Sequence, residues 1–185
     1  MEQVDMVQEM EIEKVNQEME KLKVNQAMKK LTTKEEMDKT SGEISIFRGK
    51  YFFLSTLYLS DIKYQKYVYN SVEHIYQTAR CAEKSDKEKM RNVTTPKAAK
   101  ILGKFIKPRP YWDVEKMRAM SHGNELKFLR HPKLRKKLIK TGNKQLINQN
   151  YWHDTYWGVC GCTKHKKTGM NLLGKILMKI RSEML

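Results

Sequence analysis

The amino-acid composition changes abruptly at the Thr-Ser-Gly sequence of residues 40–42, and this change limits which part of the chain can form a core. Residues 1–40 contain no glycine, proline, aromatic residue or cysteine. Such a segment lacks the residues that make turns and the rings that dominate core packing. We therefore predict a charged helical or disordered extension over residues 1–43 and a folded domain over residues 44–185.

The extension contains a nine-residue repeat, K-V-N-Q-E-M-E-K-L at residues 14–22 and K-V-N-Q-A-M-K-K-L at residues 23–31. Nine residues rotate a helix by about 900°, which places equivalent residues of the two copies on opposite faces. The apolar residues therefore do not form the continuous seam of a heptad coiled coil. Self-association through residues 1–40 is an alternative that this pattern leaves open.

The predicted domain is strongly basic. Residues 44–185 carry thirty Lys/Arg and ten Asp/Glu, a net charge of +20, whereas residues 1–43 carry seven and eleven, a net charge of −4. A positive field of this size favours anionic partners such as phosphates or nucleic acid. The alternative is that many of the lysines only keep the surface soluble.

The cysteine count and hydropathy pattern indicate a cytoplasmic, intracellular protein. An odd and sparse set of three cysteines argues against a disulfide framework and for a reducing compartment. No apolar run approaches the roughly 20 residues that span a bilayer, so we expect no membrane association. The first thirty residues are charged throughout, which is not typical of a secretory signal.

Local patterns predict an α+β domain that is mainly helical and has a small β-sheet. The segment from Ile44 to Tyr69 is rich in β-branched and aromatic residues, which predicts two or three short strands. The H-G-N sequence at residues 122–124 predicts a local break or kink in a helix. The predicted helices run from an N-cap at Ser71 to about Lys84, from Thr95-Pro96 to Leu102 with a stop at Gly103, from Asp113 onward, from Pro132 to Thr141-Gly142, and from Leu172 to Met184.

Three stretches concentrate side chains that carry out chemistry. They are N-S-V-E-H-I-Y-Q-T-A-R at residues 70–80, K-P-R-P-Y-W-D at 107–113 and N-Y-W-H-D-T-Y-W-G-V-C-G at 150–161. All three tryptophans lie in the last two stretches, which we expect to be loops. Aromatic rings in loops are costly to expose, so we expect them to line a site. The alternative is that they cover the core beneath the loops.

The chain resembles the YbiA-like family, also called NADAR, through motifs that occur in the family's order and rough spacing. The similarity covers about residues 44–185 and leaves the extension outside. The motifs are L-S-T at 54–56, V-E-H-I-Y-Q at 72–77, R-P-Y-W-D at 109–113, L-K-F at 126–128, T-G at 141–142, D-T-Y-W-G at 154–158 and G-M-N-L-L-G-K-I-L-M at 169–178.

This resemblance implies an N-glycosidase-type hydrolase that needs no cofactor and no metal. Family activities fall into two groups, cleavage of phosphoribosylated amino-pyrimidine intermediates of riboflavin synthesis and removal of ADP-ribose from guanine bases. Both substrates are phosphorylated and both are cut at the anomeric carbon. The charge of the domain leans toward the second group, where the base lies in nucleic acid.

Glu73 and Asp154 are the predicted catalytic pair. Cleavage of a bond between C1′ and nitrogen builds positive charge on the ribose, which a carboxylate stabilises while it activates water. Glu73 matches the motif glutamate of the family and is the first candidate, with Asp154 the second. The alternative for Glu73 is that a carboxylate in the first turn of a helix only favours the helix dipole.

The remaining candidates are predicted to bind the substrate. Tryptophan rings suit stacking on a base, basic side chains and helix starts suit phosphates, and the family motifs add further positions. These candidates are Ser55, His74, Gln77, Arg80, Arg109, Trp112, Lys127, Trp157, Gly158 and Asn171.

The chain departs from the family pattern at two places. Arg80 stands where relatives commonly have lysine, and arginine cannot act as an amine nucleophile or base. The segment after Gly158, V-C-G-C-T-K-H-K-K-T, is longer and more basic than the usual short acidic loop. The first departure supports an alternative function, a non-catalytic module that binds ADP-ribosylated or phosphorylated nucleic acid.

The same segment contains Cys160, Cys162 and His165, with His153 nearby, which are potential zinc ligands. Their spacing is not a usual zinc motif, and the resemblance implies no metal. The sequence therefore predicts no metal site.

Overall fold

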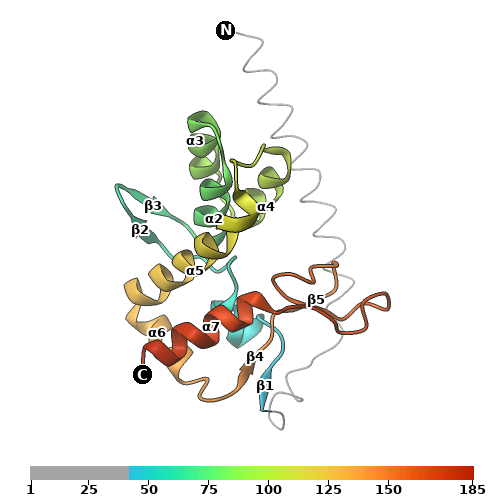
Figure 1. Cartoon of the computed structure of the whole chain (residues 1–185). Coiled ribbons are helices and arrows are strands. Elements are labelled where there is room, and N and C mark those ends of the chain that lie inside the picture. The colour runs from blue at the N-terminus through green and yellow to red at the C-terminus, as the bar shows by residue number, and fades with distance from the viewer. Residues whose placement is uncertain (1–41) are drawn as a thin grey trace.

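The computed structural model describes residues 42–185, so the repeat and the predicted extension lie outside the described residues except at their very end. Self-association through residues 1–40 accordingly stays a prediction. Figure 1 shows helices α2, α3 and α4 gathered at one end of the molecule and α6 and α7 at the other, with the long helix α5 between them.

Helix α2 (Val72–Arg80) forms the centre of the fold. Its predicted N-cap is confirmed, because Ser71 Oγ accepts a hydrogen bond from the backbone N–H of His74. Seven successive residues, 72–78, are buried against α3, α4 and α5. The predicted end near Lys84 is wrong, since Cys81 takes an extended conformation and a separate helix follows.

That separate helix, α3 (Lys84–Asn92), was not predicted from the sequence. Met90 is its only buried residue, so the sequence has no periodic spacing of apolar residues that would predict this helix. Met90 packs with Cys81, Ala99 and Ile106 in a small second core.

Two glycines lie inside helices rather than at helix ends, contrary to prediction. Helix α4 (Pro96–Phe105) is capped by Thr95 as expected. It continues past Gly103, and this glycine lies directly against Gln77 of α2, where a larger residue would not fit. Helix α5 (Trp112–Arg130) is continuous through residues 122–124, so the predicted break is wrong. A Cβ added at Gly123 would lie 3.1 Å from Val72 Cγ1, so this glycine allows α2 and α5 to approach closely.

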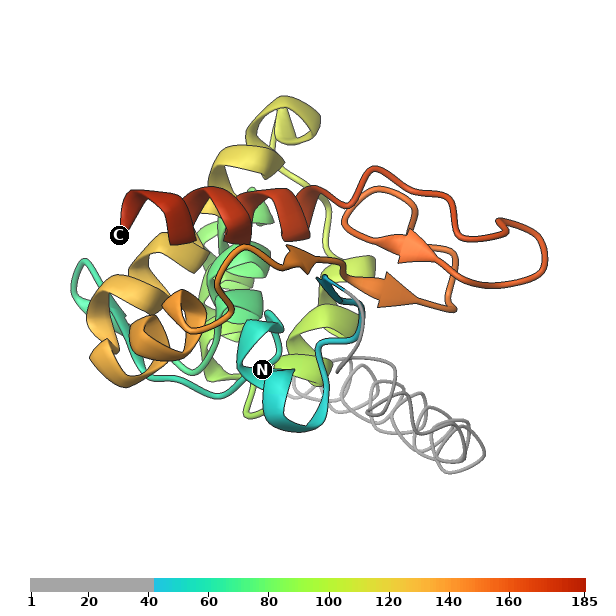
Figure 2. The same ribbon diagram turned by 90° about the horizontal axis from the view of Figure 1, so that it is seen from below.

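The last two helices agree with prediction to within two residues. Helix α6 (Pro132–Ile139) has its proline in the first turn, where no amide hydrogen is needed. Helix α7 (Leu172–Glu183) buries Leu173, Ile176, Leu177 and Ile180 in the main core. Figure 2 shows α7 running alongside the strand segment that contains β4.

Among the described residues, the short strands form three separate two-stranded pairs instead of the single small sheet that the sequence suggested. β1 (Glu43–Ile44) pairs in parallel with β4 (Gln145–Leu146), and β5 (Gln149–Asn150) pairs in parallel with β6 (Val159–Cys160). β2 (Ile62–Tyr64) and β3 (Tyr67–Tyr69) form an antiparallel hairpin, as expected for part of the aromatic segment.

The remainder of the aromatic segment forms the 3-10 helix η2 (Gly49–Leu54) rather than a strand. Phe53 and Leu54 of η2 join the main core, which places the residues that follow η2 next to α2. Within residues 42–185, no helix is both long and apolar enough to cross a membrane.

Candidate active site

A pocket of about 720 Å³ lies between the end of η2, one side of α2, one face of α4 and the loop that follows β5. This volume is in the range of sites that enclose nucleotide-sized ligands. The polar and aromatic residues of its wall are Phe47, Arg48, Phe52, Ser55, Thr56, Glu73, Tyr76, Gln77, Arg80, Lys97, Lys100, Lys104, Asn148, Gln149, Trp152, Asp154 and Trp157.

Glu73 contributes a carboxylate that is buried in the wall of this pocket and fixed in orientation. Its Oε2 accepts a hydrogen bond of 2.9 Å from Thr56 Oγ1, and its Oε1 accepts one of 2.9 Å from Gln77 Nε2. The Glu73 backbone N–H also donates to the carbonyl of Thr56. The helix N-terminus is capped by Ser71, so the Glu73 side chain is directed to pocket residues rather than back to its own helix end.

Gln77 lies one helical turn after Glu73, which is why the two side chains meet. Its Oε1 is buried and has no hydrogen-bond partner among the described residues. Gly103 of α4 leaves the room that this amide occupies, because an added Cβ would overlap Gln77 Oε1. The position of the Glu73 carboxylate therefore depends on a glycine in another helix.

Asp154 brings a second carboxylate to the same pocket from the opposite wall. Its Oδ1 accepts hydrogen bonds from the backbone N–H groups of Tyr156 (3.1 Å) and Trp157 (2.8 Å). The loop is held further by Asn150, whose Oδ1 accepts from Asp154 N–H and whose Nδ2 donates to the Asp154 carbonyl. Asp154 thus both lines the pocket and organises the turn that presents Trp157.

Several aromatic rings line the pocket. The Tyr76 and Trp157 rings meet edge to face with centroids 5.7 Å apart. Burial and the neighbouring Glu73 carboxylate both raise the pKa of Tyr76 well above its ordinary value, so the phenol stays protonated. Phe52 and Trp152 add exposed rings at the rim, where a flat ligand could stack.

Basic side chains line another part of the pocket wall, mainly on α4. Lys97, Lys100 and Lys104 lie on one face of α4, since residues three and seven positions apart share a helix face. Arg80 also lines the pocket, but its Nη1 donates to the carbonyls of Gly103 and Ile106 at the end of α4. Arg80 therefore joins α2 to α4 as well as contributing charge.

Of the predicted site residues, six line the same pocket, namely Ser55, Glu73, Gln77, Arg80, Asp154 and Trp157. Six others lie outside the lining of this pocket and have other partners. They are His74, Arg109, Trp112, Lys127, Gly158 and Asn171.

His74 faces away from the pocket and connects α2 to the chain after α3. Its Nε2 lies 2.9 Å from the carbonyl of Val93, and its Nδ1 lies 2.8 Å from Ser71 Oγ. A carbonyl can only accept, so Nε2 carries the proton and Nδ1 accepts from the serine hydroxyl. Burial lowers the pKa of His74, which keeps this neutral tautomer at neutral pH.

Lys127 lies behind the pocket wall. Its side chain is fully buried, and Nζ donates a hydrogen bond of 2.8 Å to the carbonyl of Ser55. Burial lowers the pKa of Lys127 to about 7. Lys127 thus positions Ser55 and does not line the pocket itself.

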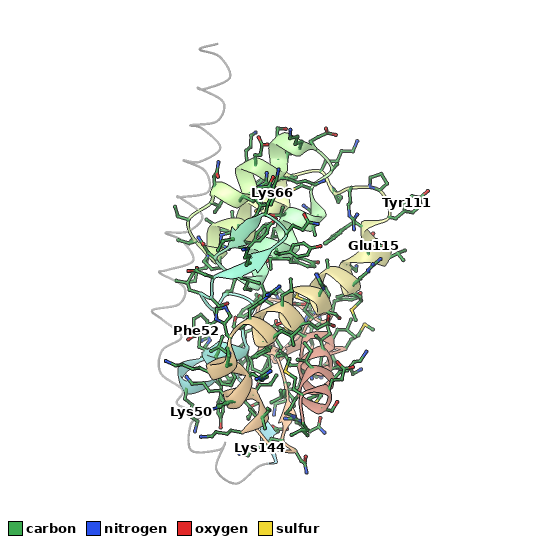
Figure 3. The ribbon with its side chains drawn as sticks, turned by 90° about the vertical axis from the view of Figure 1, so that its left-hand side faces the viewer. Lys50, Phe52, Lys66, Tyr111, Glu115 and Lys144 are labelled. Atoms are coloured by element: carbon green, nitrogen blue, oxygen red, sulfur yellow. The ribbon has the colours of Figure 1, made fainter. Side chains whose placement is uncertain are left out.

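Trp112 and Arg109 form a layer behind Tyr76. The buried Trp112 ring lies 5.0 Å from the Tyr76 ring, and the Arg109 guanidinium lies over Trp112 and 3.5 Å from Glu115 Oε2. Figure 3 shows Glu115 and Phe52 of the pocket rim on opposite sides of the molecule.

Gly158 and Asn171 hold the start of α7 against the strands. Asn171 has a left-handed backbone, its Oδ1 accepts from Asn148 N–H and its Nδ2 donates to the Leu146 carbonyl. Gly158 is buried, and a Cβ at this position would overlap the Asn148 carbonyl. Both residues are therefore close to the pocket residue Asn148 without lining the pocket.

Several pocket residues were missed by sequence reasoning, although some carried a signal. Lys97, Lys100 and Lys104 follow a predicted helix start at spacings of three and four, which a helix-face count would have detected. Thr56 and Tyr76 lie within quoted family motifs. Arg48 and Gln149 carry no local signal, since their position depends on tertiary packing.

Comparison with known proteins agrees with this architecture. The solution structure of YbiA from Escherichia coli matches with a TM-score of 0.68 and 26% identity, over 78% of this chain and 86% of that chain. A model of the NADAR domain matches residues 33–185, and the chain belongs to this family.

Individual relatives carry related names. N-glycosidase YbiA of Escherichia coli is 32% identical over 114 residues, which are 60% of this chain and 68% of YbiA. N-glycosidase R617 of Acanthamoeba polyphaga mimivirus is 42% identical over 80 residues, 39% of this chain and 46% of that protein. The riboflavin biosynthesis protein PYRR of Arabidopsis thaliana is 32% identical over 104 residues, 53% of this chain and 16% of that protein.

The chain thus spans less than half the length of the mimiviral protein and a sixth of the plant protein. The mimiviral and Escherichia coli relatives both carry the name N-glycosidase.

Proposed function

We propose that this protein is a hydrolase that cleaves an N-glycosidic bond at the anomeric carbon of a ribose phosphate or of ADP-ribose. The observation that carries the proposal is the buried Glu73 carboxylate, fixed by Thr56 and Gln77 in the wall of a pocket that also has basic and aromatic sides. Each side suits one part of such a substrate, namely the ribose, the phosphates and the base.

In the proposed reaction, the bond between C1′ and the base nitrogen breaks, and its electron pair leaves with the base. Glu73 stabilises the positive charge that develops on the ribose and accepts a proton from the water that attacks C1′. Asp154 is the second carboxylate of the pair, and its negative charge stabilises the same developing cation from the other wall. Glu73 then passes the proton that it took from water to the departing base nitrogen, so the products are the free sugar and the neutral base. The enzyme needs no covalent intermediate for this sequence.

The proposed substrate contacts follow from the positions of the other side chains. Lys97, Lys100 and Lys104 on α4 bind the phosphates. Trp157 and Trp152 stack on the base, an interaction worth roughly 1–3 kcal/mol per base. A protonated Tyr76 beside Glu73 is a hydroxyl donor for the ribose.

Both substrate groups implied by the family fit this scheme. The strong positive charge of residues 44–185 favours ADP-ribosylated guanine within nucleic acid, because one phosphate does not require a net charge of +20. The similarity to PYRR, whose name places that protein in riboflavin biosynthesis, supports the phosphoribosylated amino-pyrimidine as the competing substrate.

Mass spectrometry of products tests the proposal. Wild-type protein is incubated with an oligonucleotide that carries ADP-ribose on guanine and, separately, with a phosphoribosylated amino-pyrimidine. We expect release of ADP-ribose from the first, and a loss of about 10²–10⁴-fold in Glu73→Gln. The amide can keep both hydrogen bonds, donating to Thr56 Oγ1 and accepting from Gln77 Nε2, so the fold is retained.

Glu183→Gln on the exposed end of α7 is the matched control and keeps wild-type turnover. Cleavage of the phosphoribosylated amino-pyrimidine alone would identify the competing group as the substrate class. Binding of the oligonucleotide without product from either substrate would overturn the enzyme and favour the non-catalytic binding module, with Arg80 the first residue to revert to lysine.

A further inference from the structure

Four potential metal ligands meet at one point in the loop segment that follows β5. His153 comes from the loop before β6, Cys160 ends β6, and Cys162 and His165 lie just beyond it. One ligand atom of each side chain lies within 4.8 Å of all the others. This cluster is separate from the pocket, since none of the four residues lines it.

Three of the six distances within the cluster lie within about 0.5 Å of the edges of a zinc coordination tetrahedron. Bond lengths of about 2.05 Å to nitrogen and 2.3 Å to sulfur give edges of about 3.3 Å between two nitrogens and about 3.6 Å between nitrogen and sulfur. His153 Nδ1 lies 3.2 Å from His165 Nδ1. Cys162 Sγ lies 3.4 Å from His153 Nδ1 and 3.1 Å from His165 Nδ1.

The backbone around the cluster is folded tightly in a way that brings these side chains together. Cys160 N–H donates to the Thr168 carbonyl, and Lys167 N–H donates back to the Cys160 carbonyl, both at 2.9 Å. His153, Lys166 and Lys167 have positive φ angles although none is a glycine. Left-handed backbone at such residues persists only where surrounding interactions determine it.

We propose that His153, Cys160, Cys162 and His165 form a structural zinc site, with each histidine binding through Nδ1. The protein supplies all four ligands, which is the arrangement of structural rather than catalytic zinc. Binding releases two thiol protons, so one Zn²⁺ and two thiolates add no net charge to a loop that already carries Lys164, Lys166 and Lys167.

The sequence alone predicted no metal because the C-x-C-x-x-H spacing is unusual. The structure places His153, which lies seven residues before Cys160, at the same point as the other three side chains and so closes the ligand set. The β5–β6 pairing explains how these segments meet, since Asn150 and Cys160 are direct partners in the parallel ladder. Three ligands from the end of β6 and the turn after it, and a fourth from the preceding loop, thus complete a site whose sequence spacing is not a usual zinc motif.

The site would also fix one wall of the pocket. His153 stands between Trp152 and Asp154, both of which line the pocket. A metal bond to His153 therefore restrains the residues on either side of it. Zinc at this position is expected to act on the pocket through the loop conformation and not through contact with the substrate.

Metal analysis of untagged protein prepared without chelators tests the proposal. We expect about one zinc per chain, the content of a closed four-ligand site, and less than about a tenth of that in Cys162→Ser and in His165→Asn. Cys81→Ala and His131→Asn are matched controls, because these residues lie outside the cluster, and both should keep full zinc content. Equal zinc in the cluster variants and the controls would overturn the site.

Cobalt substitution gives a second measurement that does not depend on any variant. Zinc is removed from wild-type protein and Co²⁺ is added alone. We expect the visible bands of tetrahedral Co²⁺ and a thiolate charge-transfer band, both abolished by one equivalent of Zn²⁺. Octahedral Co²⁺ without charge transfer, or a Cys160–Cys162 disulfide in protein kept under reducing conditions, would contradict the proposal.

Discussion

The two walls of the pocket are built by different means. The helical wall consists of α2 and α4, in which Glu73 and Gln77 meet because they are one turn apart, and the lysines share a face for the same reason. The loop wall over residues 148–157 has no helix and depends on the side chains of Asn150 and Asp154. One wall is determined by packing, and the other by a few polar contacts.

This difference indicates where each wall is vulnerable. Side chains of the helical wall move only if a helix moves, which costs core packing. The loop wall can lose its shape when a single hydrogen bond or ligand bond is removed. The following predictions test this contrast, from the largest expected effect to the smallest.

The Asp154→Asn substitution separates charge from turn formation in the loop wall. Asparagine keeps an oxygen that can accept from Tyr156 N–H and Trp157 N–H, so the turn survives while the negative charge is lost. We expect turnover to fall about 10²-fold or more with little change in thermal stability. The measurement is initial rate together with Tm.

Asp154→Ala loses both the charge and the turn, so it should lower turnover and stability together. Wild-type turnover in Asp154→Asn combined with loss in Asp154→Ala would show that this carboxylate only shapes the loop.

Lys127, which lies behind the pocket wall, should make the stability of the fold depend on pH. Its pKa of about 7 in the folded protein lies below the ordinary value of 10.5, so the unfolded chain binds more protons between these values. Stability should therefore rise with pH above about 7, by up to about 1.4 kcal/mol per pH unit from this group.

Denaturant unfolding of wild type and Lys127→Met at about pH 7 and pH 9 isolates this contribution as a difference. The variant leaves the Ser55 carbonyl with its second donor, Tyr58 N–H, so the comparison is not dominated by an orphaned acceptor. Identical pH dependence in the two proteins would show that Lys127 is not the group responsible.

The Gly103→Ala substitution in α4 tests whether a change in this helix displaces the Glu73 carboxylate on α2. The added methyl would overlap Gln77 Oε1 and displace the amide that holds Glu73. We expect a loss of about 1–3 kcal/mol in stability from overpacking and a parallel fall in turnover. Gly42→Ala is the control, since an added Cβ there meets nothing within 4 Å.

A second substitution sharpens this test. Gln77→Ala in the Gly103→Ala background removes the overlap and should restore stability without restoring turnover. Recovery of both would mean that Gln77 has no part in positioning Glu73.

Lys100→Gln tests the outer face of the helical wall with a smaller effect. Lys100 is exposed and lies 5.6 Å from the Trp152 ring, so a bound phosphate there gains one charged contact. We expect KM to rise about tenfold at unchanged kcat, the loss of one charge-assisted hydrogen bond. Lys133→Gln on α6 is a control, and an equal rise there would indicate only long-range attraction.

The sequence predicted the helical wall better than the loop wall, for a physical reason. Ser71 is an N-cap that acts locally, so the start of α2 was predictable, and the same holds for Thr95 before α4. Gly103 was misread because local patterns treat a glycine as a stop, whereas its role is to make room for Gln77. A close contact between two helices produces no recognisable pattern in the sequence of either helix alone.

The candidate site shows the same division. Glu73 and Asp154 were singled out by residue type and family motif, and both line the pocket. His74, Lys127 and Trp112 were singled out in the same way, yet each is buried in a supporting contact instead. The sequence alone does not distinguish motif residues that line the pocket from motif residues that support its wall. That distinction requires the three-dimensional structure.

The burial of seven successive residues in α2 has a consequence for how such a protein can evolve. A helix with no solvent-facing side over residues 72–78 offers no neutral positions, because every substitution there disturbs either the core or the pocket. Mutational drift and adaptation to new ligands must then concentrate on α4 and the loop wall. The centre of the fold is thereby expected to stay fixed while specificity diverges around it.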